Sequence, residues 1–126
     1  GPFNLECFSV TQSIPDPSAV LLRTKFGNIF HTGDWKFDNE PTIGKPTDIT
    51  SLKKIGDEGI LALVCDSTNI FESGSSGSEG SLFNSLDKLI KQRKFGRIIV
   101  SCFSSNVARL KTISKVAKKN KKICKC

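Results

Sequence analysis

The six residues at positions 60–65, Ile-Leu-Ala-Leu-Val-Cys, are apolar without interruption and are followed at once by Asp66. A short, wholly apolar run of this kind is typical of a strand that is covered on both faces inside a layered α/β sheet. It is much shorter than the roughly 20 residues that a membrane-spanning helix needs. We therefore predict an α/β protein that does not enter a membrane, with the polar residues 66–69 at the carboxyl end of a buried strand.

The chain after residue 60 repeats this pattern of strand, polar loop and helix. A capping-box pattern at residues 76–79 precedes apolar residues at helical spacing, and a second helical pattern follows Asn106. Residues 97–103 predict a second buried strand, and a third begins near residue 122. Residues 60–126 thus predict a βαβαβ unit with parallel strands and right-handed crossovers.

The first part of the chain predicts an antiparallel meander. Short β-branched or apolar runs at residues 5–10, 19–24 and 28–31 are separated by Pro- and Gly-containing turns. A long loop then leads to a helix over residues 48–55, with Asp48 as its cap and the glycines that follow as its end.

Charge and cysteine content suggest partners and a compartment. The net charge is +7, and residues 64–126 hold thirteen of the 19 basic side chains but only four of the 12 acidic ones. A basic surface of this kind attracts the phosphates of RNA, although a solvated helix face gives the same composition. The five cysteines are odd in number and lie mostly within apolar runs, which favours reduced thiols in the cytoplasm.

Three polar clusters follow predicted strands, at residues 32–34, 66–69 and 104–106. Ligands of open parallel sheets bind beyond the carboxyl ends of the strands. The first two clusters supply carboxylates that can hold a divalent cation or position a water molecule, and the third can contact a phosphate. Each also has a purely structural explanation as a turn, an Asx-turn or a helix cap.

Five motifs in order carry a family resemblance. They are Thr-Gln-Ser-Ile-Pro-Asp at 11–16, His-Thr-Gly-Asp-Trp-Lys-Phe-Asp at 31–38, Asp-Ser-Thr-Asn at 66–69, Gly-Ser-Glu at 77–79 and Phe-Ser-Ser-Asn at 103–106. Together they resemble the ribonuclease J family. This resemblance implies a metallo-β-lactamase fold with a β-CASP insertion, and a zinc-dependent, homo-oligomeric RNA hydrolase with 5′ exonuclease and endonuclease activity in RNA maturation and decay.

The resemblance also assigns regions and roles. Residues 1–70 match the second half of the metallo-β-lactamase core, and residues 71–126 match the beginning of the β-CASP domain. The family's His-x-His-x-Asp-His segment has no counterpart here, so we expect an internal fragment that is inactive alone. By the resemblance, Asp34 bridges two Zn²⁺ ions, for which Mn²⁺ can substitute, and Asp66 assists proton transfer beside them. Ser104, Ser105 and Asn106 match the loop that lines the RNA channel.

Gln12 is the main departure from the family pattern. It stands where the family has a zinc-ligating histidine, and an amide oxygen binds zinc much more weakly than an imidazole. Three explanations are open: an enzyme with one metal or an altered metal, a degenerate paralogue, or a sequencing error. A non-catalytic RNA-binding module is the alternative from another class of function.

Overall fold

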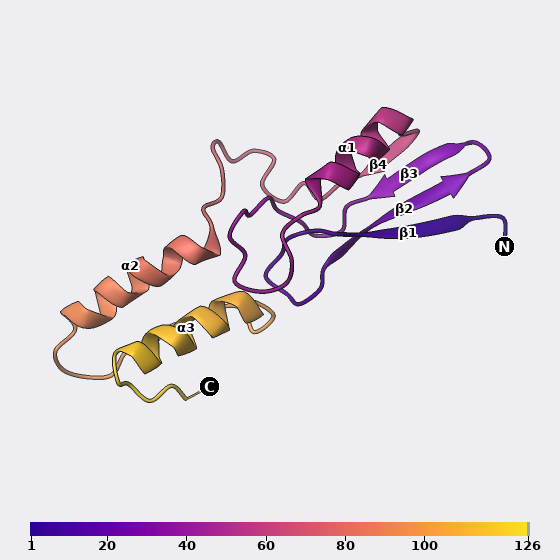
Figure 1. Cartoon of the computed structure of the whole chain (residues 1–126). Coiled ribbons are helices and arrows are strands. Elements are labelled where there is room, and N and C mark those ends of the chain that lie inside the picture. Colours follow the sequence, from indigo (N-terminus) through magenta and orange to yellow (C-terminus); the bar gives the residue numbers. More distant parts are fainter. Residues whose placement is uncertain (126) are drawn as a thin grey trace.

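The computed structural model describes residues 1–125 and shows an α/β chain with a four-stranded mixed sheet and three helices (Figure 1). Cys126, one of the five cysteines predicted to be reduced thiols, lies outside the described residues. The elements in chain order are β1 (Asn4–Ser9), β2 (Ser18–Thr24), β3 (Gly27–His31), α1 (Ile49–Glu58), β4 (Ala62–Val64), α2 (Glu79–Gln92) and α3 (Val107–Lys119).

The sheet has the strand order β1-β2-β3-β4. Strands β1 to β3 pair antiparallel, with Cys7 opposite Val20 and Leu21 opposite Phe30, so the predicted meander is confirmed. Strand β4 joins β3 in parallel, with Phe30 opposite Leu63. Since parallel strands end at the same edge, the segments that follow β3 and β4 begin side by side.

The core lies on one face of the sheet, against α1. Alternate strand residues point to that face, and the buried cluster consists of Phe8, Val10, Ala19, Leu21, Phe30 and Ile55, the last from α1.

Asp48 caps α1, as predicted, by accepting a hydrogen bond from the backbone N–H of Ser51 at 3.0 Å. The helix continues through Gly56, contrary to prediction, and ends only at Gly59, whose φ of 89° lies in the left-handed region that glycine tolerates.

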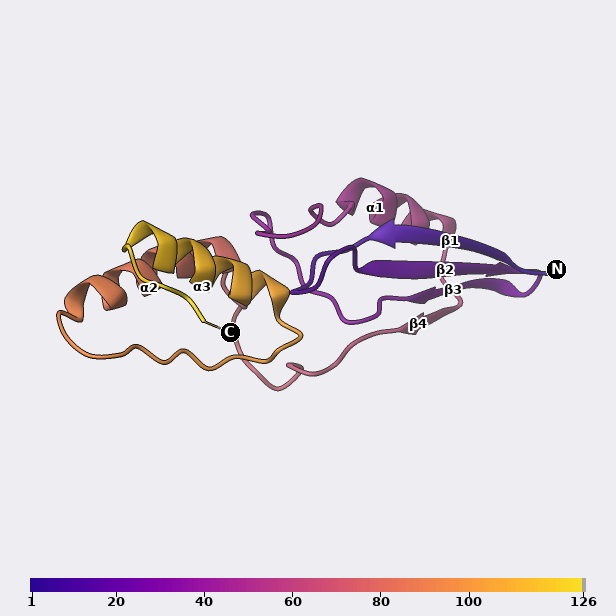
Figure 2. The same cartoon turned by 90° about the horizontal axis from the view of Figure 1, so that it is seen from below.

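Helices α2 and α3 form a pair beyond the end of the sheet (Figures 1 and 2). Glu79 in the first turn of α2 contacts Arg109 in the first turn of α3, and Asp87 contacts Lys119 at the end of α3, so the two helices run parallel. The chain between them returns along their whole length. Ser78, rather than the predicted Ser76, caps α2 by accepting from the N–H of Gly80 at 3.1 Å.

The predicted βαβαβ unit is wrong in its strands. Only Ala62–Val64 of the first apolar run is a strand, and all three residues are exposed. Residues 97–103 are extended but pair with no strand among residues 1–125, and no strand forms between residues 122 and 125. A strand needs a neighbour that offers backbone donors and acceptors, and the described part of the chain provides none for these segments.

Within the segment between α2 and α3, residues 98–100 nevertheless alternate in exposure as they would in a strand. Ile99 is 90% exposed, whereas its neighbours Ile98 and Val100 are 39% and 38% exposed.

Among the described residues, no helix is both long and apolar enough to cross a membrane.

Candidate functional site at the strand ends and the helix junction

Thr32 connects the ends of β3 and β4. Its backbone N–H donates to the carbonyl of Val64 at 2.9 Å, and its hydroxyl oxygen accepts from the N–H of Asp66 at 3.2 Å. Thr32 has no exposed surface. These two hydrogen bonds hold the loop that carries Asp34 beside the loop that carries Asp66, so the structure brings together the first two of the three predicted polar clusters.

The two carboxylates at this edge differ in their surroundings. Oδ1 of Asp66 accepts from the hydroxyl of Thr68 at 2.5 Å and from its backbone N–H at 2.9 Å. These two hydrogen bonds lower the pKa of Asp66, and the one from the hydroxyl has the larger effect. Asp34 is exposed, and its carboxylate has no hydrogen bond or ion pair with any of residues 1–125. Asp34 therefore presents an uncommitted carboxylate, whereas Asp66 is held within its own turn.

The third cluster lies at the start of α3, where only one of its residues is partly buried. Asn106 caps the helix, because its Oδ1 accepts from the N–H of Arg109 at 2.8 Å. Ser104 and Ser105 form the exposed turn before it. The structural explanation for Asn106 is thus confirmed, while a role for the two serines in contacting RNA stays a prediction.

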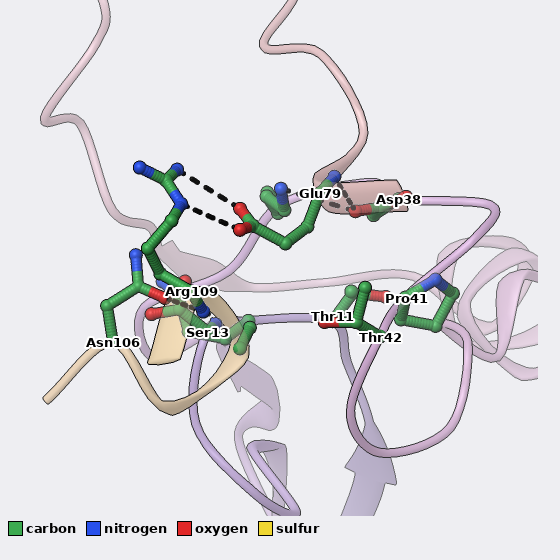
Figure 3. A pocket seen from close by; sticks show the side chains of 11 residues that line it. Thr11, Ser13, Asp38, Pro41, Thr42, Glu79, Asn106 and Arg109 are labelled. Carbon is green, nitrogen blue, oxygen red and sulfur yellow. Dashed lines mark hydrogen bonds and ion pairs between the residues drawn. The ribbon is translucent and has the colours of Figure 1, made fainter. Parts of the chain in front are cut away.

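A pocket of about 150 Å³ lies where α2 and α3 meet the loops that follow β1 and β3 (Figure 3). Gln12 and Asn106, which belong to motifs far apart in the sequence, both line this pocket. Its lining is Thr11, Gln12, Ser13, Lys36, Asp38, Pro41, Thr42, Glu79, Asn106, Ala108 and Arg109.

An ion pair closes one side of this pocket. Both oxygens of Glu79 accept from the guanidinium of Arg109, at 2.7 Å from Nε and 3.1 Å from Nη2 (Figure 3). Glu79 is only 8% exposed, whereas the Arg109 side chain is 34% exposed, so this bidentate pair is buried on its carboxylate side. The sequence pattern places Glu79 in a capping box and predicts no role for Arg109, because a contact across 30 residues leaves no local signal.

Asp38 anchors α2 to the loop after β3. Its carboxylate accepts from the backbone N–H groups of Glu40 at 3.0 Å and Glu79 at 3.1 Å, and from Nζ of Lys36 at 3.3 Å. Burial alone raises the pKa of Asp38, but the hydrogen bonds from Ser78, the backbone and Lys36 outweigh it and lower the pKa to about 2. Asp38 is therefore ionised at neutral pH.

The described residues do not by themselves fit a zinc centre. No group of three or more His, Cys, Asp or Glu residues in the described part of the chain is placed to hold a metal ion. The side-chain oxygen of Gln12, the one that would face a metal, accepts from the N–H of Ser13 at 2.7 Å. His31 ends β3, and its Nδ1 accepts from the N–H of Gly33 at 2.9 Å.

Comparison with curated proteins places the relatives of this chain among the ribonucleases. Three of them are ribonuclease J proteins, from Sinorhizobium meliloti at 47% identity over 117 residues, from Corynebacterium glutamicum at 43% over 110, and from Helicobacter pylori at 42% over 124. The alignments cover 93%, 87% and 98% of this chain, so the resemblance to ribonuclease J is confirmed.

The chain spans only about a fifth of the curated relatives that it matches, 21%, 15% and 18% in the same order. No protein-family model matches the sequence.

Proposed function

We propose that this chain is part of a metal-dependent RNA hydrolase of the ribonuclease J type. The observation that carries the proposal is the match to ribonuclease J proteins over nine tenths of the chain, at identities above 40%. The uncommitted carboxylate of Asp34, held beside the Asp66 loop by Thr32, supports it. Residues 1–70 form part of the metallo-β-lactamase core in this proposal, and residues 71–126 begin the β-CASP domain.

Asp34 is the metal ligand in this proposal, because a carboxylate binds hard and borderline cations such as Mn²⁺ and Zn²⁺. The other ligands come from residues outside this chain. A metal ion held there would supply a water of lowered pKa as the nucleophile for phosphodiester hydrolysis. Asp66 accepts a proton at Oδ2 in this proposal, since both hydrogen bonds from Thr68 go to Oδ1 and its lowered pKa keeps the carboxyl group ionised.

The test is an Asp34→Ala change in a complete ribonuclease J protein that carries this sequence. We expect loss of RNA hydrolysis by two or more orders of magnitude with unchanged thermal stability, because Asp34 has no partner among residues 1–125. Asp57→Ala, which removes an exposed carboxylate from α1, is the matched control. Full activity of the Asp34→Ala protein would contradict the assignment of Asp34 as a ligand.

A second candidate function is a non-catalytic RNA-binding module. One observation favours it: the only two acids in residues 79–125, Glu79 and Asp87, are both buried and both bound to basic side chains. The exposed surface of the helix pair therefore carries uncompensated positive charge. Retention of RNA binding by a complete protein that does not cleave RNA, even with added zinc or manganese, would select this function.

A further inference from the structure

We propose that the pocket at the helix junction binds a phosphate group, and that Thr42, Lys36 and Arg109 are its contacts. The proposal deepens the proposed function, since RNA supplies phosphodiester groups, and it rests on that function for the identity of the source. The pocket volume of about 150 Å³ exceeds the roughly 30 Å³ that one water occupies in the liquid, so it has room for a tetrahedral oxyanion.

The first argument is an orphaned hydroxyl. Oγ1 of Thr42 is buried and has no hydrogen-bond partner among the described residues, and Thr42 is one of the residues that line the pocket (Figure 3). The backbone carbonyl of Thr42 accepts from Nζ of Lys111 on α3 at 2.8 Å, which links this loop to the helix. A buried polar atom left without a partner costs about 1–3 kcal/mol, and a bound ligand that accepts from it removes this cost.

The second argument is that the acceptors of the pocket are already used. The carboxylate of Asp38 already accepts from two backbone N–H groups and from Lys36, and both oxygens of Glu79 accept from Arg109. The side-chain oxygens of Gln12 and Asn106 each accept from a backbone N–H. Because a backbone N–H can only donate, these contacts fix the amide orientation and leave the two amide NH₂ groups without an acceptor among residues 1–125.

The donors, by contrast, have capacity left. Arg109 uses two of the five N–H groups of a guanidinium on Glu79, and Lys36 uses one of its three on Asp38. The backbone N–H groups of the first α3 turn are spent, since Ala108 donates to the carbonyl of Ser13 and Arg109 to the cap. The ligand must therefore bring acceptors and is held by side chains.

The third argument is charge. Within the pocket, the charges of Asp38 and Glu79 balance those of Lys36 and Arg109. Residues 79–125 as a whole carry thirteen basic side chains and only two acidic ones, Glu79 and Asp87. A negatively charged, acceptor-rich group matches both the spare donors and the surrounding field. Phosphate, as a free ion or as part of an RNA chain, has that chemistry.

The test is titration of the 126-residue chain with inorganic phosphate, followed residue by residue in amide NMR spectra at constant ionic strength. We expect saturable shifts at residues 12–13, 42 and 106–109. Thr42→Val removes only the orphaned hydroxyl and should raise the Kd about tenfold, the effect of about 1.4 kcal/mol. Its matched control is Thr50→Val on the exposed face of α1, which should leave the Kd unchanged.

A second pair of variants guards against a folding defect. Lys36→Met should weaken phosphate binding, while Lys53→Met, the same charge change on α1, should not. If a short RNA displaces phosphate, the ligand of the site is RNA. If RNA does not compete, the ligand is a free phosphate ion. Both results support a site for an anion. Absence of saturable shifts, or equal affinity in Thr42→Val and the unmodified chain, would overturn the proposal. None of these readouts requires hydrolysis, so they are independent of the enzyme assignment.

Discussion

Asp38 is the residue whose ionisation most directly affects how the helices attach to the sheet. The folded-state pKa of about 2 lies below the ordinary value of 3.8, so its contribution to stability is complete above pH 4 and is lost as the pH falls through 2. We predict that Asp38→Asn lowers the free energy of unfolding at pH 7 by about 2 kcal/mol. The variant should also show a shallower loss of stability between pH 4 and pH 2.

Urea denaturation at a series of pH values measures both effects. Asp57→Asn is the matched control, because Asp57 is exposed on α1 and makes no ion pair with residues 1–125. A parallel displacement of the Asp38→Asn and unmodified curves at every pH would show that the carboxylate charge does not stabilise the fold.

Gln12 is the second residue with a testable consequence. Its side-chain oxygen is bound to its own neighbour's N–H, so it offers a metal less than a histidine would. We predict that Gln12→His in a complete ribonuclease J protein of this sequence raises zinc- or manganese-dependent RNA cleavage by one or more orders of magnitude. Turnover measured at saturating metal checks this, and equal rates for the two proteins would exclude position 12 as a ligand position.

At the scale of elements, α3 depends on its cap. We predict that Asn106→Ala destabilises the chain by about 1 kcal/mol, since the N–H of Arg109 loses its acceptor. Asn106→Asp retains that acceptor and should keep the stability, while it removes the amide donor. Thermal unfolding separates the variants, with Ser105→Ala on the exposed preceding turn as the control. Equal losses in the Asp and Ala variants would show that Asn106 stabilises the chain by something other than capping.

The elements differ in how well the sequence predicts them. Strands β1 to β3 and the helices follow from alternation, helical spacing and caps such as Asp48, all of which are local. Residues 97–103 have the composition of a buried strand, yet Ile99 is 90% exposed, because burial depends on a neighbour that composition does not supply.

The candidate site shows the same division between local and distant information. The positions of Asp34 and Asp66 after β3 and β4 follow from the strand pattern. The Glu79–Arg109 pair and the orphaned hydroxyl of Thr42 arise from contacts between distant segments, and no local pattern reveals them.

At the scale of the whole molecule, the positive charge separates into bound and free lysines. Lys91 and Lys119 both donate to Asp87 at 2.8 Å, and Asn120 donates to its other oxygen, which keeps the pKa of Asp87 well below its usual range. Lys119 also lies 5.1 Å from the ring centre of Phe83. The Lys91 contact lies within α2, whereas Lys119 and Asn120 hold the end of α3 to α2.

Lys118, Lys121 and Lys122, in contrast, are exposed and form no ion pair with the described residues. We predict that the 126-residue chain binds single-stranded RNA without sequence preference, with an affinity that falls steeply as salt increases. Reversing these three lysines to glutamate should weaken binding and reduce the slope of log K against log salt by about 2, from roughly 0.7 per lost phosphate contact. Fluorescence anisotropy over a range of salt concentrations measures the slope. The control reverses Lys25, Lys53 and Lys54, which lie at the sheet end of the molecule, and an equal loss in both triple variants would show that net charge rather than this surface drives the binding.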